Sequence, residues 1–358
     1  MIFVDHMPGN AFENLTPRNF GFSDAAEAFV FLSGVSLAVA YGRRFLSGQR
    51  LQTLRGLAKR ELRLYGAHIG LSLAGLIIFF AGAAWMGKPA LLEVHGRDLF
   101  VDNPGLGMLG LVSLGHQLGY FNILPLYIIL IAFAPVLLWL AAIDRRLMLG
   151  VAALVYGLFR LSGWNIPSWP APGVWFFDPF AWQLLFAIGL AVGLSLRKAA
   201  VPRSRPMMIV CALIVGASAV VVTRGFGFGA SADAWQSVRD ALDLDKAQLG
   251  LVRLIHFLAV AYLIYGLGVT DWLRHWPAYR PAALLGRHSL WVFALLSLFS
   301  AIWQVLVAGV TPTIWLDSTF LVASIAIIYL ATRWIDTDSI RESSPAGVEV
   351  IAPSGSRP

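Results

Sequence analysis

Long apolar runs separated by short polar connections dominate the chain. A run of about 20 residues is needed to cross the hydrocarbon core of a bilayer as a helix. The pattern predicts nine such helices, at residues 24–42, 64–86, 123–143, 146–162, 180–197, 206–223, 250–271, 284–309 and 314–335. Residues 1–5 resemble the end of one more helix and lack the basic start of a signal peptide. The expected fold is an all-α, polytopic membrane bundle of about ten transmembrane helices, the first one truncated.

Composition supports a membrane protein and excludes several other classes. Hydrophobic residues make up 58% of the 358 residues and charged residues 13%, with a mean hydropathy of +0.71. A soluble domain has about 25% charged residues. The net charge of +7 does not predict nucleic-acid binding, because the basic residues flank apolar runs. Cys211 is the only cysteine and the seven histidines are scattered, so no disulfide within the chain and no metal site are expected.

Basic connections alternate with acidic, aromatic or mixed ones, which predicts the orientation in the membrane. The basic connections are 43–63, 144–146, 197–205 and 274–287; the others are 87–122, 163–179 and 224–249. The positive-inside rule places the basic set and the C-terminus in the cytoplasm. Asp5 and His6 then face the outer side. The chain is therefore expected to cross a lipid bilayer several times.

Two segments outside the spans have a pattern of their own. Residues 43–63 carry leucines at helical spacing and arginines on the other faces, which predicts an amphipathic helix on the cytoplasmic leaflet that turns into the next span. The tail 337–358 is rich in Ser, Pro and Gly and is expected to be a disordered cytoplasmic segment. Residues 1–336 are expected to form a single transmembrane domain.

Ionisable residues near the outer ends of the spans are candidates for function, because charge is costly there. His6 is the candidate general base, since histidine titrates near neutrality and an adjacent carboxylate, from Asp5 or Glu27, can orient it. An interfacial histidine without a role remains the alternative. The remaining outer polar and aromatic side chains are candidates for substrate binding: Asp24, Asp178, Trp182, Gln183, Arg253 and His256.

Asp24 and Glu27 also have a purely structural interpretation. Their spacing is that of a capping box at the start of a helix. Glu27 points into a run of Ala and Phe, so a buried basic partner such as Arg253 is expected. Arg253 and His256 lie three residues apart and therefore share one helix face.

Arginines cluster on the cytoplasmic side, where an anionic donor would arrive. Arg60 and Arg63 open one span, and Arg43 and Arg44 precede it. Anchoring by the positive-inside rule explains such residues without a function. Read functionally, paired guanidinium groups suit phosphates such as those of coenzyme A.

The N-terminal motif is similar to that of a known family. The run Asp5-His6…Pro8-Gly9-Asn10…Asn19-Phe20-Gly21-Phe22-Ser23-Asp24-Ala25-Ala26-Glu27 resembles the OpgC family, as do Arg253-Leu-Ile-His256 and Leu285-Gly-Arg-His-Ser-Leu290. The resemblance implies a bacterial inner-membrane protein related to the acyltransferase-3 superfamily. His6 matches that superfamily's histidine, and Arg60-Glu-Leu-Arg63 matches its Arg-x-x-Arg. An Arg/Asp-rich stretch and an Arg-Gly normally precede the histidine in the first helix, and their absence from this sequence is the main departure.

The resemblance implies an O-acyltransferase that moves succinyl groups from cytoplasmic succinyl-CoA to hydroxyls of osmoregulated periplasmic glucans. No permanently bound cofactor is expected; acyl-CoA is the donor substrate and the glucan is the acceptor. Other glucan-synthesis proteins are candidate partners. In this scheme Arg60 and Arg63 hold the CoA phosphates, and Arg253 and His256 steady the acyl carboxylate or the oxyanion. A transporter or flippase for a glycan or lipid-linked anion is the alternative, and a non-catalytic scaffold is a third possibility.

Overall fold

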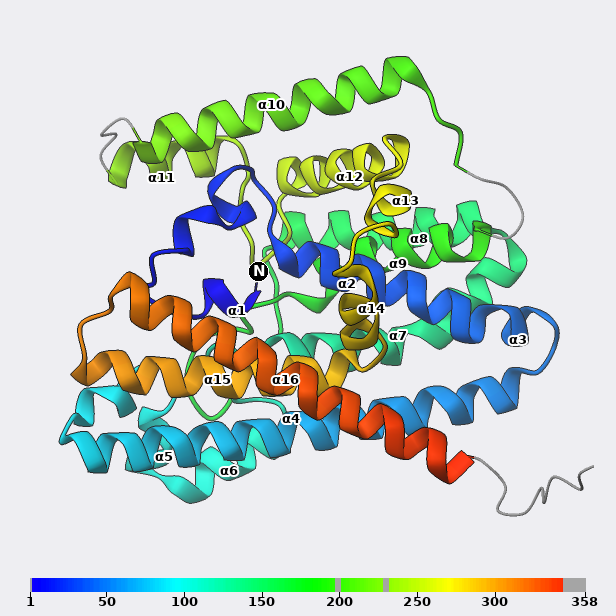
Figure 1. Ribbon diagram of the computed structural model, residues 1–358. Coiled ribbons are helices and arrows are strands. Elements are labelled where there is room, and N and C mark those ends of the chain that lie inside the picture. Colours follow the sequence, from blue (N-terminus) through cyan, green and yellow to red (C-terminus); the bar gives the residue numbers. More distant parts are fainter. Residues whose placement is uncertain (1, 197–200, 228–231, 344–358) are drawn as a thin grey trace, which may run out of the picture.

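The computed structural model describes residues 2–196, 201–227 and 232–343, and within these ranges the chain is helical with no β-strand (Figure 1). The long helices are α2 (Ala25–Leu37), α4 (Arg50–Met86), α7 (Ile123–Ile143), α8 (Arg145–Ser162), α9 (Pro179–Ser195), α10 (Arg205–Gly227), α12 (Leu251–Gly266), α15 (Ser289–Gly309) and α16 (Ile314–Ser343). The short helices are α1 (Ile2–Asp5), α3 (Arg43–Leu46), α5 (Asp98–Asp102), α6 (Pro104–Val112), α11 (Ala232–Ala241), α13 (Val269–Leu273) and α14 (Tyr279–Arg287). Each predicted span corresponds to a helix.

Six helices in the described ranges are long and apolar enough to cross a membrane: Ala25–Leu46, Arg50–Met86, Ile123–Ile143, Arg205–Thr223, Ser289–Gly309 and Ile314–Thr337. Two further apolar helices, Pro179–Ser195 and Leu251–Gly266, are shorter. The chain is therefore an all-helical membrane protein, whereas the count of ten spans is not confirmed. The predicted span 250–271 already ends at Gly266, and the predicted span 284–309 is interrupted at His288.

Two predicted boundaries differ from the structure. Residues 50–86 form one uninterrupted helix, so the expected turn between the amphipathic segment and the following span does not occur. At about 1.5 Å per residue, α4 is about 55 Å long and extends well beyond a hydrocarbon core of about 30 Å. Helix α16 continues to Ser343, so residues 337–343 are helical; residues 344–358 of the predicted disordered tail lie outside the described residues.

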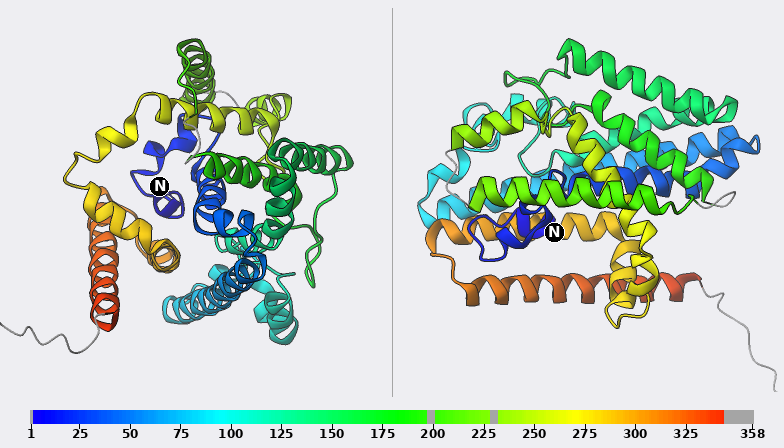
Figure 2. Two further views of the ribbon diagram at one scale, coloured as in Figure 1. Left: turned by 90° about the vertical axis from the view of Figure 1, so that its right-hand side faces the viewer. Right: turned by 90° about the horizontal axis from the view of Figure 1, so that it is seen from above.

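The long helices pack in an open ring around the N-terminal segment. Viewed along the helices, α10 and α12 lie on one side, α2 and α9 next to them, and α7, α4, α15 and α16 complete the arc (Figure 2). The chain start lies inside this arc, between α2 and α15. Helix α3 and residues 201–205 lie at one end of the long helices, and α5, α6 and α11 lie at the other (Figure 1), as the charge pattern predicts.

Helices α2 and α9 approach closely because glycines face each other at their contact. A Cβ atom placed on Gly34 would lie 2.2 Å from the Phe186 carbonyl oxygen, and one on Gly189 would lie 2.2 Å from that of Phe31. Small residues at such positions let membrane helices pack backbone to backbone. This contact fixes α2, which carries Asp24 at its N-cap and Glu27 in its first turn.

Replacing Gly34 by alanine is expected to destabilise the protein by about 1–3 kcal/mol, the usual range for an overpacked core, because backbone atoms cannot move aside as a side chain can. Gly66→Ala in α4, where an added methyl group meets nothing within 4 Å, is the matched control and should be neutral. A thiol-reactive dye can follow unfolding through Cys211, which is the only cysteine and is buried. Equal melting temperatures for the two variants would contradict the packing argument.

Candidate functional site

The N-terminal segment holds His6 inside the ring through contacts with the C-terminal helices. The Trp303 indole donates to the Pro8 carbonyl (3.2 Å), and the Gln304 amide donates to the His6 carbonyl (3.4 Å). The Ala11 amide donates to the Asp317 carboxylate (2.8 Å). After α1 ends, Gly9 takes a positive φ of 73°, which lets the chain turn at Pro8-Gly9. His6 is therefore held at a fixed depth in the bundle.

A polar pocket of about 340 Å³ surrounds the outer side of His6. Three outer connections and the N-terminal segment contribute to it, so residues far apart in the sequence share one wall. Its main polar and aromatic residues are Asp5, His6, Arg18, Asp24, His95, Tyr120, Asn122, Phe176, Phe177 and Lys246. Carboxylates, cations and aromatic rings in one cavity are suited to a polar ligand with flat faces, such as a sugar.

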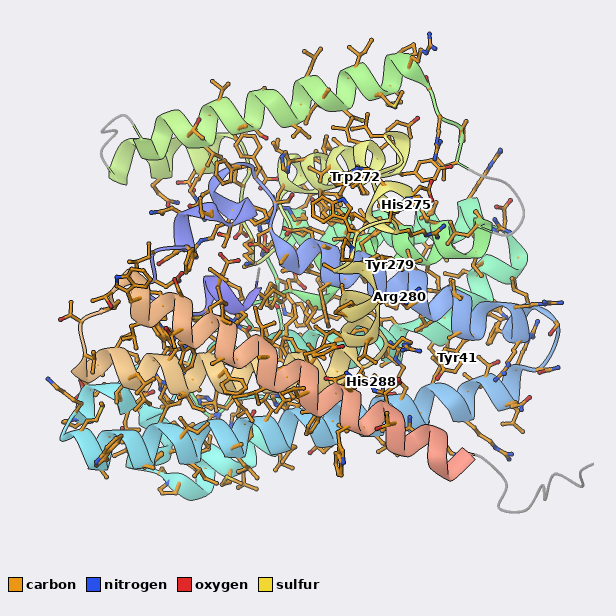
Figure 3. All side chains as sticks on the ribbon, viewed as in Figure 1. Tyr41, Trp272, His275, Tyr279, Arg280 and His288 are labelled. Atoms are coloured by element: carbon orange, nitrogen blue, oxygen red, sulfur yellow. The ribbon has the colours of Figure 1, made fainter. Side chains whose placement is uncertain are left out.

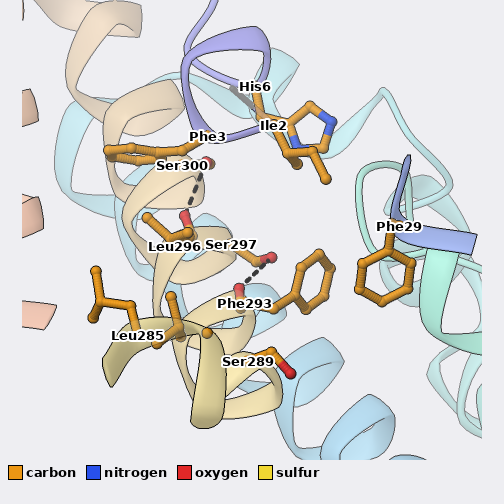
Figure 4. Close-up of a pocket in the computed structure, with 12 residues that line it drawn as sticks. Ile2, Phe3, His6, Phe29, Leu285, Ser289, Phe293, Leu296, Ser297 and Ser300 are labelled. Atoms are coloured by element: carbon orange, nitrogen blue, oxygen red, sulfur yellow. Dashed lines mark hydrogen bonds between the residues drawn. The ribbon is translucent and has the colours of Figure 1, made fainter. Parts of the chain in front are cut away.

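An apolar pocket of about 250 Å³ begins on the other side of His6 and follows α15 (Figure 4). Its lining is Ile2, Phe3, His6, Phe29, Leu285, Gly286, Ser289, Val292, Phe293, Leu296, Ser297 and Ser300. Figure 4 places His6 at one end and Leu285 and Ser289 at the other. From Ser289 to Ser300 the helix rises about 16 Å, at about 1.5 Å per residue. His6, Ile2 and Phe293 line both pockets, so the histidine stands where the two meet.

The His6 ring packs on Tyr120, whose other neighbour is His95. The ring centroids lie 4.5 Å apart for His6 and Tyr120, and 4.8 Å apart for His95 and Tyr120. His95 (φ 60°) and Tyr120 (φ 71°) both have left-handed backbone conformations, which residues other than glycine rarely adopt. Residues in such conformations cluster at functional sites. The amide of Gly119, the residue before Tyr120, donates to the His95 carbonyl (2.9 Å) and so links the two loop segments. This loop structure fixes the orientation of the imidazole.

Burial and the positive charge of Lys246 lower the pKa of His6 from 6.5 to about 4. The imidazole is then neutral at physiological pH and can accept a proton. Burial also lowers the pKa of His95, and Arg97 adds to that effect. Burial alone would raise the pKa of Asp24, but Lys246 and Arg253 outweigh it and hold that pKa well below 3.8. Asp24 is thus an ionised wall of the polar pocket.

The predicted partnership of Glu27 with Arg253 is present in the structure. Arg253 donates to the Glu27 carboxylate through Nε and lies 2.9 Å from Asp24 Oδ2, which also lies 2.6 Å from Lys246 Nζ. The capping box is present as well, since Glu27 accepts from the Asp24 amide (2.8 Å) and Asp24 accepts from the Ala26 amide (2.8 Å). Asp24 and Glu27 therefore form the capping box of α2 and also pair with the Arg253 guanidinium.

The carboxylates that were expected to orient His6 bond elsewhere. Arg18 Nε lies 3.3 Å from Asp5 Oδ1, and Glu27 is fully buried against Arg253. Asp5 still lines the polar pocket with His6, whereas Glu27 lines neither pocket. Tyr120, which the sequence did not single out, is the side chain that packs on the imidazole. A role of Asp5 or Glu27 in catalysis stays a prediction.

Most of the candidate substrate-binding residues lie behind the pocket wall. Asp24 lines the polar pocket directly. His256 is buried, with Nδ1 2.8 Å from the Ser23 hydroxyl, and Arg253 is occupied by the two carboxylates. Neither of these two lines a pocket, so their predicted contact with substrate remains a prediction.

Asp178, Trp182 and Gln183 support a neighbouring loop. Asp178 accepts from the Phe180 amide (2.9 Å) at the start of α9, and the Trp182 indole donates to the Lys246 and Ala247 carbonyls (3.1 Å each). The Gln183 amide donates to the Ala152 carbonyl (2.7 Å). None of the three lines either pocket. Trp182 therefore positions Lys246, and direct substrate binding by the three stays a prediction.

The four arginines predicted to bind CoA phosphates lie at the end of the bundle that the charge pattern assigns to the cytoplasm. Arg60 donates to the Tyr127 hydroxyl, and its guanidinium lies 5.6 Å from the centre of that ring. Arg43, Arg44 and Arg63 are exposed. None of the four lines the two pockets, so their phosphate role also stays a prediction.

Several residues that line the polar pocket could not be recognised from the sequence. Arg18, His95, Tyr120, Asn122 and Lys246 come from connections without a recognisable motif. Phe176 and Phe177, from the connection 163–179, also line the pocket. Among the described residues, no group of three or more His, Cys, Asp or Glu side chains is placed to hold a metal ion.

A comparison with protein-family models identifies the chain. The model described as OpgC protein matches residues 1–340. The chain belongs to the OpgC family. Membership in the OpgC family points to a role in the modification of osmoregulated periplasmic glucans. No curated protein and no solved structure is significantly similar to this OpgC-family chain.

Proposed function

We propose that this OpgC-family protein is a membrane-bound O-acyltransferase of the acyltransferase-3 type, which transfers succinyl groups from succinyl-CoA to hydroxyls of osmoregulated periplasmic glucans in the bacterial inner membrane. The position of His6 at the junction of the two pockets carries the proposal. An acyl transfer across a membrane needs one base that both substrates can reach from opposite sides. The polar pocket suits the glucan hydroxyl, and the apolar pocket suits the thioester arm.

In the proposed reaction the neutral His6 imidazole accepts the proton of a glucan hydroxyl. The hydroxyl oxygen attacks the thioester carbonyl, the new C–O bond forms, and the C–S bond breaks as the tetrahedral intermediate collapses. The imidazolium then gives its proton to the departing CoA thiolate, which restores the neutral histidine. Arg18 and Lys246 in the polar pocket would stabilise negative charge on the acceptor side.

The decisive experiment uses purified protein in lipid nanodiscs with isotope-labelled succinyl-CoA and a periplasmic glucan. Mass spectrometry should show labelled succinyl esters on the glucan and an equivalent release of free CoA. The alternative function is that of a transporter or flippase, which could also use the two adjoining pockets. Such a protein would move glycan across the membrane of sealed vesicles without consuming succinyl-CoA. Movement without ester formation would exclude the transferase.

The pKa of His6 predicts an unusual pH profile. Because the neutral imidazole is the base, kcat/KM should fall as the pH decreases through about 4, and not through 6.5. The measurement is kcat/KM from pH 3.5 to 8, with size-exclusion chromatography at each pH to show that the protein remains folded. An acid limb near 6.5 would mean that His6 is not the titrating base.

A further inference from the structure

The segment that connects α12 to α15 presents aromatic and basic side chains to the cytoplasm. Residues 271–280, with the sequence Asp-Trp-Leu-Arg-His-Trp-Pro-Ala-Tyr-Arg, are all exposed. Trp272, Trp276 and Tyr279 are 57%, 47% and 40% exposed, although aromatic side chains are usually well buried. Figure 3 shows Trp272, Tyr279 and Arg280 along this connection. We define Trp272, Trp276, Tyr279 and Arg280 as the cytoplasmic platform.

The cytoplasmic platform is continuous with the inner end of the apolar pocket. Helix α14 carries Tyr279 and Arg280 at its start, and Leu285 and Gly286 of the same helix line the pocket. Five residues separate Arg280 from Leu285, a rise of about 8 Å. A ligand that reaches Leu285 in the apolar pocket therefore lies within one to two helical turns of Tyr279 and Arg280.

The basic side chains near Leu285, at the inner end of the apolar pocket, differ in whether a carboxylate already neutralises them. Arg287 lies 3.5 Å from Asp336 Oδ2, so α16 provides its counter-charge, and His288 Nε2 lies 3.0 Å from Asp336 Oδ1. Arg280 has no carboxylate partner in the described ranges. Its guanidinium is free to bind an anion. The two indoles of the same segment contact each other edge to face, with centroids 4.5 Å apart and planes inclined at 62°, and each keeps about half of its surface exposed.

We propose that the cytoplasmic platform binds the nucleotide end of the acyl-CoA donor, with the adenine on the Trp272–Trp276 pair and a phosphate on Arg280. Base–aromatic stacking and arginine–phosphate pairing are the interactions that recognise a nucleotide. The apolar pocket then holds the thioester arm and directs it towards His6. The proposal rests on the proposed function for the identity of the donor, and it assigns the nucleotide to α13 and α14 instead of to the arginines around α4.

Tryptophan and arginine also anchor membrane proteins at the lipid headgroups. The two roles predict different kinetic effects. Anchoring acts on stability and on all substrates equally, whereas a nucleotide site distinguishes a donor that carries the nucleotide from one that lacks it.

The test compares succinyl-CoA with the succinyl thioester of N-acetylcysteamine, which has the reacting group but no nucleotide. In full-length protein in nanodiscs, Trp272→Ala and Arg280→Ala should each raise KM for succinyl-CoA by about 5- to 100-fold, the effect of one lost base–aromatic stack or a comparable contact. KM for the short thioester should not change. Trp334→Ala, which removes a 68%-exposed indole from the cytoplasmic half of α16, is the control for lipid anchoring and should change neither value.

Equilibrium dialysis with radiolabelled CoA separates this proposal from the proposed function. If the wild-type protein transfers no succinyl group but binds CoA, and Trp272→Ala weakens that binding, the platform stands and the transferase assignment fails. If the wild-type protein transfers succinyl groups but the platform variants keep the wild-type KM for succinyl-CoA, the platform is overturned. Absence of CoA binding by the wild-type protein, or an equal rise of KM for both thioesters, would also overturn it.

Discussion

Replacing His6 by alanine is expected to reduce glucan succinylation by about 10²- to 10⁴-fold, the usual contribution of a general base. The reason is positional as well as chemical. His6 lines both pockets, and its environment keeps the imidazole neutral. The loss should lie in kcat, while KM for succinyl-CoA stays near the wild-type value, because the apolar pocket keeps most of its lining.

His95→Ala is the matched control for the His6 variant. It removes an imidazole from the other side of Tyr120 in the same pocket. It should act mainly on KM for the glucan and leave most of the turnover intact. The measurement is labelled succinate per glucan by mass spectrometry, with protein folding verified by the Cys211 melting assay. Undiminished transfer by His6→Ala would remove this residue from the mechanism.

The second large effect is expected at the buried ion pair between Glu27 and Arg253. Arg253→Ala leaves a fully buried carboxylate without its guanidinium, and breaking such a pair costs about 3–5 kcal/mol. That cost is a large fraction of a typical folding free energy of about 5–15 kcal/mol. We expect a strongly lowered melting temperature and poor yield of folded protein.

A double variant distinguishes the ion pair from simple loss of packing. Glu27→Gln combined with Arg253→Gln removes both charges, so it should be more stable than Arg253→Ala despite carrying two changes. Asp271→Asn, which breaks an ion pair with Arg274 whose partners are both 63% exposed, is the surface control and should leave the melting temperature unchanged. A double variant as unstable as the single one would argue against a charge-based explanation.

The sequence predicted the helices well because their signal is local. Apolar runs gave the approximate position of every long helix, and the basic connections gave the two ends of the bundle. The turn expected after the amphipathic segment was wrong, because residues 43–63 were read as a surface segment whereas residues 50–86 continue as one helix. The length of an apolar run does not show whether the helix continues beyond the bilayer.

The site was predicted less completely, because its walls come from connections that only the fold brings together. His6, Asp5 and Asp24 were identified from their positions at helix ends, and all three line the polar pocket. Tyr120, His95 and Lys246 carry no motif, and their proximity to His6 depends on how three outer loops fold over the ring. Trp182 and Gln183 were assigned to substrate, although they bond to backbone. Residue type alone does not distinguish a pocket wall from its support.

The hydrogen bonds that hold the N-terminal segment to the C-terminal helices have a consequence for biogenesis. Ala11 and Asp317 are 306 residues apart, and Pro8 is held by Trp303. A ribosome adds about 5–20 residues per second, so about 15–60 s pass between synthesis of the two partners of the first contact. During that interval His6 has no fixed position. The contacts that hold the N-terminal segment are therefore completed only after α15 and α16 have been synthesised.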